Sequence, residues 1–325
     1  MSIRVGIIGV GVMGADHARK INGSISGAEV SAVADFDAGR AASVAAELRE
    51  ATVAADGKEL IARDDVDAVI VASHDSTHAE LVLAALAANK PVLCEKPLAP
   101  TAAECREIIS AQGDRNLITV GFMRRFDPAY NELKRAATVE RIGETLVAHC
   151  VSRNVSAGPG DSAATITNSA IHELDIMPWL LGSPITEASW HAGRTSKHSG
   201  IRQDPQIMLL RTESDVLMTV ELFVNARYGY DTRCEIVGED GVASFAVPAH
   251  VIVDNELKRS IEYPLDWVPR YAEAYRLELQ EWIDSIDEGR PSSLADADAG
   301  LRAGLVADAL VVSMNEGGRT VAVEY

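Results

Sequence analysis

The segment 168–175 carries three polar side chains at a spacing that suits acid–base chemistry. If the segment is helical, Asn168, His172 and Asp175 stand at positions i, i+4 and i+7 and share one face of the helix. The unperturbed pKa of histidine lies near physiological pH, so His172 could take the proton of an alcohol as the alcohol is oxidised. The alternative is a surface histidine with acidic neighbours.

A second candidate is the lysine of Glu95-Lys96-Pro97, which directly follows an expected strand at Val92–Cys94. Ligands bind open α/β sheets beyond the carboxyl ends of the parallel strands. At that place Lys96 could donate a hydrogen bond to a substrate hydroxyl and stabilise negative charge on its oxygen. The alternative is a solvated lysine paired with Glu95.

A glycine-rich turn, Gly9-Val10-Gly11-Val12-Met13-Gly14, follows the first expected strand. Such G-x-G-x-x-G turns open a helix and let backbone N–H groups approach a pyrophosphate. Asp35 comes 21 residues after Gly14, at the end of the next strand, where a carboxylate can accept hydrogen bonds from a ribose diol. Asp35 and Asp37 would repel the additional phosphate of NADP, so the pattern favours NAD; Arg40 leaves the use of both cofactors open.

Two further signals are weaker. In Gly121–Pro128, Arg124 could face a ligand or form a salt bridge across the domain boundary. His17, His74 and His78 lack carboxylates or thiols at ligand spacing, so we expect these histidines in helix packing and turns and expect no metal.

Composition limits the possible partners and the location of the protein. The 325 residues predict two domains, and the net charge of −18 disfavours nucleic acid and membrane surfaces as partners. No apolar run approaches the length of a membrane span, and the first residues do not resemble a signal peptide. We expect a cytoplasmic protein with reduced thiols at its four dispersed cysteines, Cys94, Cys105, Cys150 and Cys234.

The first 121 residues alternate short apolar strands with Ala- and Leu-rich helices, a pattern typical of a parallel sheet covered on both faces. The expected strands are Ile3–Ile8, Val30–Ala34, Ala68–Ala72, Val92–Cys94 and Leu117–Gly121. The expected helices are Gly14–Ile21, Gly39–Arg49, Thr77–Ala88 and Ala102–Ala111. These segments predict an α/β domain.

After residue 140, strand-like segments follow one another with turns between them, which favours an antiparallel sheet. Hairpins are expected for Gln206–Arg211 with Val216–Asn225 and for Cys234–Val237 with Val242–Val247. Helices are expected at Tyr271–Asp287 and Ala297–Met314, followed by a strand at Arg319–Glu324. The last expected strand of the first domain ends at residue 121, so the second domain is expected to comprise residues 122–325 and to contain this antiparallel sheet.

With these residues in place, the chain resembles the Gfo/Idh/MocA oxidoreductase family over essentially its whole length. The general markers are the glycine loop, Glu95-Lys96-Pro97 and the His172 segment. Two more specific markers, Gly121–Pro128 and Phe223–Asp231, point to the inositol branch of the family, and Ala274–Gln280 adds support.

The resemblance implies an NAD-binding Rossmann domain at residues 1–121. It also implies a substrate-binding and oligomerisation domain at residues 122–325, with a large, open, mostly antiparallel sheet that builds dimers or tetramers. The implied reaction is NAD-dependent oxidation of one hydroxyl of a cyclic polyol, most closely myo-inositol to 2-keto-myo-inositol. The same resemblance assigns the proton transfer to a lysine and histidine pair, matched here by Lys96 and His172.

The expected site residues fall into three groups. The catalytic residues are Lys96, His172 and Asp175. The expected contacts to NAD are Gly9, Gly11, Val12, Met13, Gly14, Asp35, Ser73, His74, His78, Glu95 and Lys96. The expected contacts to the polyol are Lys96, Arg124, Asn154, Asn168, His172, Asp175 and Tyr230.

One position departs from the family pattern. Many inositol dehydrogenases have an aspartate four residues before the catalytic histidine, where this chain has Asn168. An amide can orient the imidazole but contributes no full charge. His172 could then be a weaker base. Either Asp175 compensates, the activity is shifted to another polyol, or the enzyme is slow with myo-inositol.

Two alternatives to oxidation of myo-inositol stay open. The first is the same chemistry on scyllo-inositol, chiro-inositol or an aldose, because one or two side chains can decide which epimer is accepted. The second is a non-catalytic NAD-binding sensor. The presence of both Lys96 and His172 argues against a sensor, and the acidic composition argues against a DNA-binding repressor.

Overall fold

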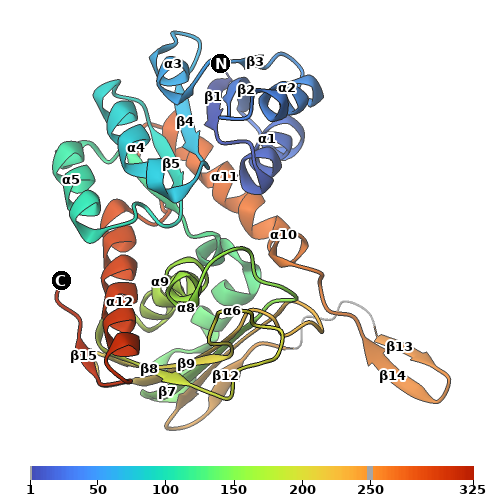
Figure 1. Cartoon of the computed structure of the whole chain (residues 1–325), viewed down its shortest axis with the longest axis vertical. Helices are drawn as coiled ribbons and strands as arrows, with labels where there is room; N and C mark the ends of the chain where they lie inside the picture. Colours follow the sequence, from blue (N-terminus) through green and yellow to red (C-terminus); the bar gives the residue numbers. More distant parts are fainter. Residues whose placement is uncertain (1, 247–251) are drawn as a thin grey trace. The chain divides into compact units, whose positions relative to one another are not determined.

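The computed structural model describes residues 2–246 and 252–325, and their packing divides the chain into two compact units (Figure 1). Unit 1 comprises Met1–Phe126 and Glu273–Gly304, and unit 2 comprises Asp127–Ala272 and Leu305–Tyr325. A single boundary after residue 121 does not describe these units, because residues 273–304 return to the first of them.

Unit 1 contains a six-stranded sheet in the order β3-β2-β1-β4-β5-β6, and its neighbouring strands are parallel. The strands are β1 (Ile3–Ile8), β2 (Ala28–Ala34), β3 (Thr52–Val53), β4 (Ala68–Val71), β5 (Val92–Glu95) and β6 (Ile118–Gly121). The expected Rossmann architecture is confirmed. The chain order reverses between β1 and β4, which is where such sheets bind ligands beyond their carboxyl ends.

Helices cover both faces of this sheet. They are α1 (Val12–Ser24), α2 (Ala38–Glu47), α3 (Gly57–Ala62), α4 (His78–Ala87), α5 (Ala102–Gln112), α11 (Ala272–Asp287) and the first part of α12 (Ala297–Asn315), with short 3₁₀ turns at Asp75–Thr77, Gly113–Arg115 and Met123–Phe126. Val5 and Ile7 of β1 join a buried cluster with α1, α2 and Trp282 of α11. Gly6 faces the other way, where an added Cβ would lie 2.4 Å from Leu60 of α3.

Unit 2 contains a seven-stranded sheet in the order β12-β11-β7-β10-β9-β8-β15. The strands are β7 (Thr145–Arg153), β8 (Ile185–Ala192), β9 (Gln206–Thr212), β10 (Leu217–Phe223), β11 (Asp231–Gly238), β12 (Val242–Ser244) and β15 (Val321–Ala322). The sheet is mostly antiparallel, as expected, but β7 and β10 pair in parallel.

Helices of unit 2 lie on one side of this sheet in Figure 1. They are α6 (Pro128–Ala136), α7 (Val139–Ile142), α8 (Ser162–Thr165) and α9 (Ile171–Leu181), and α10 (Trp267–Arg270) follows later in the chain. Buried Cys150 and Cys234 stand opposite each other on β7 and β11, and their sulfur atoms lie 3.1 and 3.7 Å from that of Met177 in α9. These contacts seat α9 against the sheet.

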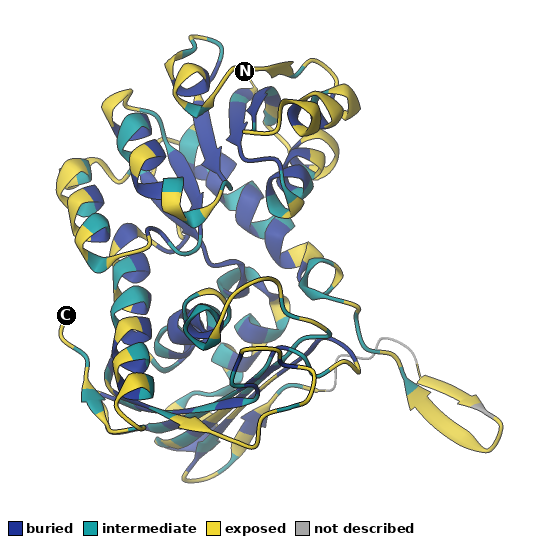
Figure 2. Ribbon diagram, in the orientation of Figure 1, coloured by how far each residue is buried: buried dark blue, intermediate teal, exposed yellow. Residues whose placement is uncertain are grey.

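Several boundaries differ from those expected from the sequence. The expected strand Val242–Val247 is formed as the shorter β12, and Val247 lies outside the described residues. The expected last strand, Arg319–Glu324, is reduced to β15. A hairpin of β13 (Ile252–Asn255) and β14 (Lys258–Ile261) was not expected, and Figure 2 shows it as an exposed arm. Among the described helices, none is both long and apolar enough to cross a bilayer.

Candidate functional site

Each of the three glycines of the loop after β1 has a different structural environment, which explains why glycine is needed there. Gly9 has φ +85°, and a Cβ on it would lie 2.4 Å from the backbone of Ser73. A Cβ on Gly14 would lie 1.8 Å from the carbonyl oxygen of Gly9, so the start of α1 packs directly on the turn. Around Gly11, in contrast, nothing lies within 4 Å of an added Cβ. The loop is therefore closed at its ends and open in the middle.

The N-terminus of α1 is open to an anion. Its N-cap is Gly11, no side chain caps the helix, and no acidic residue occupies the first turn. By comparison, α2, α3 and α5 begin with capping side chains from Asp37, Asp56 and Thr101. Uncapped N–H groups and the positive end of the helix dipole suit a pyrophosphate. Val12 and Met13, expected to contact the cofactor, lie in this first turn, with Val12 exposed.

We expect Gly14→Ala to lower the stability of the fold and Gly11→Ala to weaken NAD binding instead. Gly14→Ala forces a methyl group against the carbonyl of Gly9 and should destabilise the fold by about 1–3 kcal/mol. Gly11→Ala meets no protein atom, so the melting temperature should stay near that of the wild type while the Kd for NAD rises about tenfold, since the methyl occupies the space above the helix N-terminus. Thermal melts and NAD titrations check both. Unchanged NAD affinity in Gly11→Ala would show that the pyrophosphate binds elsewhere.

Asp35 stands at the end of β2 with its carboxylate oriented by the neighbouring backbone. Its oxygens accept hydrogen bonds from the N–H groups of Val10, at 2.8 Å, and Asp37, at 2.9 Å. Arg40 approaches the carboxylate of Asp35 to 3.3 Å and that of Asp37 to 3.7 Å. The guanidinium charge of Arg40 is thus balanced by two carboxylates at the rim of the loop.

The loops after β4 and β5 are joined through a buried histidine. One ring nitrogen of His78 lies 2.7 Å from the carbonyl oxygen of Pro97, and the other lies 3.1 Å from that of Ser73. The hydroxyl of Ser73 also contacts Thr77 at 2.7 Å. The ring of His74 is exposed and accepts a hydrogen bond from the backbone of Ser76. Contacts of Ser73, His74 and His78 with a cofactor remain predictions.

Lys96 is a partly buried lysine at the carboxyl end of β5. Burial lowers its pKa; the carboxylate of Glu95 acts against this shift, and the positive charge of Arg124 adds to it. Glu95 itself is held by a ring nitrogen of His17, 2.8 Å from its carboxylate, and by the backbone N–H of Lys96. Burial is the largest single effect and acts to raise the pKa of Glu95. The hydrogen bond and charge of His17, together with the charge and backbone N–H of Lys96, outweigh it, so the net shift is downward.

Arg124 lies in the turn after β6 and is 2% exposed. The positive charge of this buried guanidinium contributes to the lowered pKa of Lys96. The expectation that it contacts a polyol remains a prediction.

The His172 segment differs from the regular helix that its spacing predicts. Residues Ile166–Ala170 form a π-helical segment, and α9 begins at Ile171, so Asn168 and His172 are separated by a change of helical type. Asn168 is exposed, His172 is half-buried, and Asp175 is 3% exposed. The regular α-helix assumed for this spacing is not formed at Asn168, whereas His172 and Asp175 both lie in α9, three residues apart on one face of the helix. That Asn168 shares this face stays a prediction.

The two remaining candidates, Asn154 and Tyr230, flank one pair of strand residues. Arg153 ends β7 and pairs with Asp231, which begins β11. Asn154 follows Arg153 and Tyr230 precedes Asp231, so Asn154 and Tyr230 lie at the same end of these two neighbouring strands in unit 2. Tyr230 is buried, with its ring edge-on to that of Tyr271.

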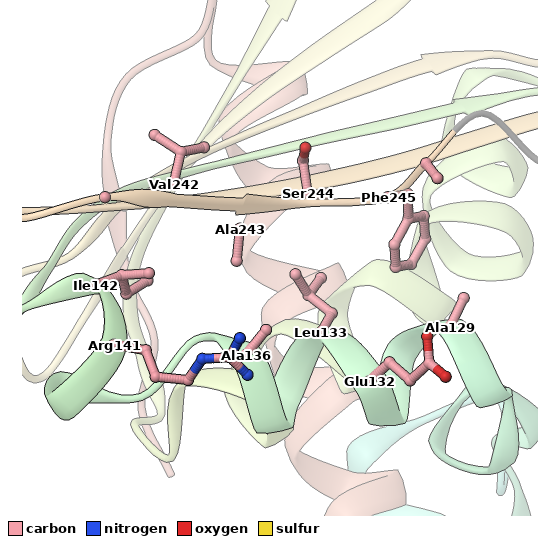
Figure 3. Close-up of a pocket in the computed structure, with 12 residues that line it drawn as sticks. Ala129, Glu132, Leu133, Ala136, Arg141, Ile142, Val242, Ala243, Ser244 and Phe245 are labelled. Carbon is pink, nitrogen blue, oxygen red and sulfur yellow. The ribbon is translucent and has the colours of Figure 1, made fainter.

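A cavity of about 620 Å³ in unit 2 does not coincide with these residues. Figure 3 shows it between α6 and β12, with Leu133 facing the strand and the charged groups of Glu132 and Arg141 nearby. The lining residues are Ala129, Glu132, Leu133, Ala136, Arg141, Ile142 and Gly241–Ala246. None of them is a candidate site residue.

Sequence patterns miss contacts that join distant segments. His17 holds Glu95 from 78 residues away, and Asp204 binds the segment after β10 from 20 residues away. Neither residue stands in a recognisable local motif, so no sequence signal marks these two roles.

Comparisons with known proteins match two consecutive parts of the chain. Residues 3–122 match the model of an oxidoreductase family with an NAD-binding Rossmann fold, and residues 140–323 match the C-terminal α/β domain of that family. The chain is 53% identical over 333 residues to inositol 2-dehydrogenase 2 of Paenarthrobacter aurescens, with 100% of each chain covered.

Two further relatives bear on the substrate. An inositol 2-dehydrogenase/D-chiro-inositol 3-dehydrogenase of Shouchella clausii is 43% identical, with 100% of this chain and 95% of the relative covered. The solved structure of myo-inositol dehydrogenase from Lactobacillus casei in complex with NAD(H) and myo-inositol superposes with a TM-score of 0.95. It is 31% identical and covers 100% of this chain and 98% of the other.

Proposed function

Because this chain belongs to the Gfo/Idh/MocA family of oxidoreductases, we propose that it oxidises myo-inositol to 2-keto-myo-inositol with NAD as the acceptor. The relative at 53% identity is an inositol 2-dehydrogenase, and the superposed Lactobacillus casei enzyme was solved with NAD(H) and myo-inositol. The single observation that carries the proposal is the position of Lys96, which is partly buried and directly follows the carboxyl end of β5 in the parallel sheet, where such sheets bind ligands.

The residues of unit 1 fit NAD. The space above Gly11 and the uncapped start of α1 leave room for a pyrophosphate. Asp35 presents a carboxylate fixed by backbone N–H groups, which suits a ribose diol, and Arg40 is already paired with two carboxylates, so the site disfavours the phosphate of NADP. NAD, when bound, supplies the acceptor for the hydride of the polyol carbon.

The chain's own side chains handle the hydroxyl proton. Lys96 donates a hydrogen bond to the reacting oxygen and stabilises the negative charge that develops on it. His172 accepts the proton of that hydroxyl, because a neutral imidazole is the base available near neutral pH. Asp175, buried one helical turn later, binds a polyol hydroxyl, and Arg124, Asn154, Asn168 and Tyr230 are assigned further hydroxyl contacts.

We expect Asn168→Asp to move the pH profile without weakening substrate binding. A carboxylate near His172 favours the protonated imidazole and raises the pKa of the base, so the acidic limb of kcat/KM should shift to higher pH by about one unit. The measurement is kcat/KM against pH, with Ser169→Asp as the control that places the charge one residue along. An unchanged profile in Asn168→Asp would show that position 168 is not coupled to the base.

The proposed function is tested by following NADH absorbance with purified protein. The panel contains myo-, scyllo- and chiro-inositol, glucose and xylose, each with NAD and with NADP. Preferred turnover of myo-inositol with NAD supports the proposal. Preferred turnover of chiro-inositol would instead place the activity with the second activity named for the Shouchella clausii relative. No turnover of any polyol at saturating NAD would contradict the proposal and favour the alternative, a non-catalytic NAD-binding sensor.

The outer face of the sheet in unit 2 supports assembly into dimers or tetramers. Along β9 and β10 alternate residues are buried on the helix side, while Ile207, Leu209, Leu217 and Phe223 on the other side are only half-buried. A broad face of this kind favours contact with a second copy. We place the enzyme in the cytoplasm, consistent with four buried cysteines that form no disulfide.

A further inference from the structure

Asp204 is a buried carboxylate that the proposed reaction does not use. Its side chain belongs to a residue with 0% exposure, just before β9 begins at Gln206. The carboxylate accepts three hydrogen bonds, from the N–H of Val224 at 2.9 Å, the N–H of Asn225 at 3.0 Å and the side-chain amide of Asn225 at 2.9 Å. All three donors are neutral and belong to the segment that follows β10. A buried carboxylate is costly unless its oxygens are hydrogen-bonded, so these three contacts tie Asp204 and the segment after β10 to each other.

The segment held by Asp204 follows β10, at the same end of the strands as two of the proposed polyol contacts. β7 and β10 run in parallel and end together, with Arg153 paired to Phe223. Arg153 also pairs with Asp231 of β11. Asn154 directly follows Arg153 and Tyr230 directly precedes Asp231, and both are proposed to contact the polyol.

Hydrogen bonds carry the restraint from Asp204 to Asn154. The N–H of Asn154 donates to the carbonyl of Phe223 at 3.0 Å, and the carbonyl of Asn154 accepts from Ala226 at 2.9 Å. The side-chain oxygen of Asn225 accepts from the N–H of Ala157 at 3.1 Å, while its amide donates to Asp204. The backbone of Asn154 is thereby fixed to Phe223 and Ala226, which flank the two residues that Asp204 binds. The loop after Asn154 is fixed to Asn225 itself.

We propose that Asp204 is a positioning residue that holds Asn154, through Asn225 and the segment 223–226, in the conformation that binds the polyol. This inference rests on the proposed function, since it takes Asn154 as a polyol contact. Asp204 touches neither NAD nor the reacting hydroxyl in this scheme. Its loss should therefore weaken polyol binding and leave NAD binding in unit 1 unchanged.

The test compares Asp204→Asn with the wild type. The amide keeps the shape of the side chain but replaces one acceptor oxygen by an NH₂ group that faces N–H donors of Val224 or Asn225. We expect the KM for myo-inositol to rise about 10–100-fold, as small misplacements of binding groups cost up to about 10²-fold, with the KM for NAD unchanged. Amide hydrogen exchange should accelerate in peptides covering 154–157 and 223–227. Asn225→Ala, which removes only the side-chain link, should give the same pattern with a smaller amplitude.

Asp215→Asn is the matched control, because it makes the same chemical change in the turn between β9 and β10, at the opposite end of these strands. Asp215 is exposed and pairs with Arg211 at 2.5 Å, so no effect on KM is expected. If Asp204→Asn does not fold, the polyol KM and the amide exchange of Asn225→Ala test the inference in its place. Unchanged polyol KM and unchanged exchange at 154–157, or an equal rise in the KM for NAD, would overturn the inference. If the wild type turns over no polyol, the proposed function fails, and the exchange measurement alone then decides whether Asp204 holds the segment.

Discussion

Lys96→Ala is expected to lower kcat for myo-inositol about 10²–10³-fold and to change the Kd for NAD little, because the glycine loop and Asp35 stay intact. The ammonium group is proposed to stabilise the charge that develops on the reacting oxygen, and the removal of one such donor commonly costs a factor of this size. Because burial lowers the pKa of Lys96, its proton should be lost at a pH below the ordinary range of a lysine, and kcat should fall on the basic side of the profile. Steady-state kinetics against pH and NAD titration measure both effects.

Lys90→Ala is the matched control for this experiment. Lys90 stands before the amino end of β5, donates to the carbonyl of Arg63 at 2.6 Å, and also has a pKa lowered by burial. Its loss should leave kcat intact. Lys96→Arg adds a second test, because arginine keeps its charge and should move the basic limb to higher pH if its guanidinium reaches the oxygen. Near-normal kcat in Lys96→Ala would remove Lys96 from the mechanism.

His172→Gln should lower kcat about 10²–10⁴-fold, the range usual for the loss of a positioned general base. Below its pKa the imidazole is protonated and cannot accept the hydroxyl proton, so activity of the wild type should rise with pH through that pKa. In His172→Gln this acidic limb should disappear, and the residual rate should increase with hydroxide. The KM for NAD should stay unchanged because the residue belongs to unit 2.

His191→Gln provides the control for the histidine experiment. His191 lies on β8 in the same unit, and its ring contacts Ser189 at 3.1 Å. Its replacement should change neither kcat nor the acidic limb. An acidic limb that persists in His172→Gln would assign the base to another residue and would reduce His172 to a substrate contact.

Much of unit 1 could be predicted from the sequence because its signals are local. The strand Ile3–Ile8 is rich in β-branched residues and is formed with the expected bounds, and the glycine loop after it is placed as its pattern indicates. The two-residue edge strand β3 was not expected, because both of its residues are exposed and no apolar pattern marks it. The return of α11 to the same core was also not expected, since it depends on Trp282 meeting residues of β1 far away in the chain.

The fold class, the NAD-type glycine loop with Asp35, and the candidate side chains Lys96 and His172 could all be predicted from the amino-acid sequence alone. Each of these rests on residue types and spacings within a few positions, where backbone geometry alone connects sequence to structure. Tertiary packing sets the burial that lowers the pKa of Lys96, the π-helical segment that contains Asn168, and the link from Asp204 to Asn154. Desolvation, helix distortion and long-range hydrogen bonds depend on which distant segments pack together, and no local pattern encodes that.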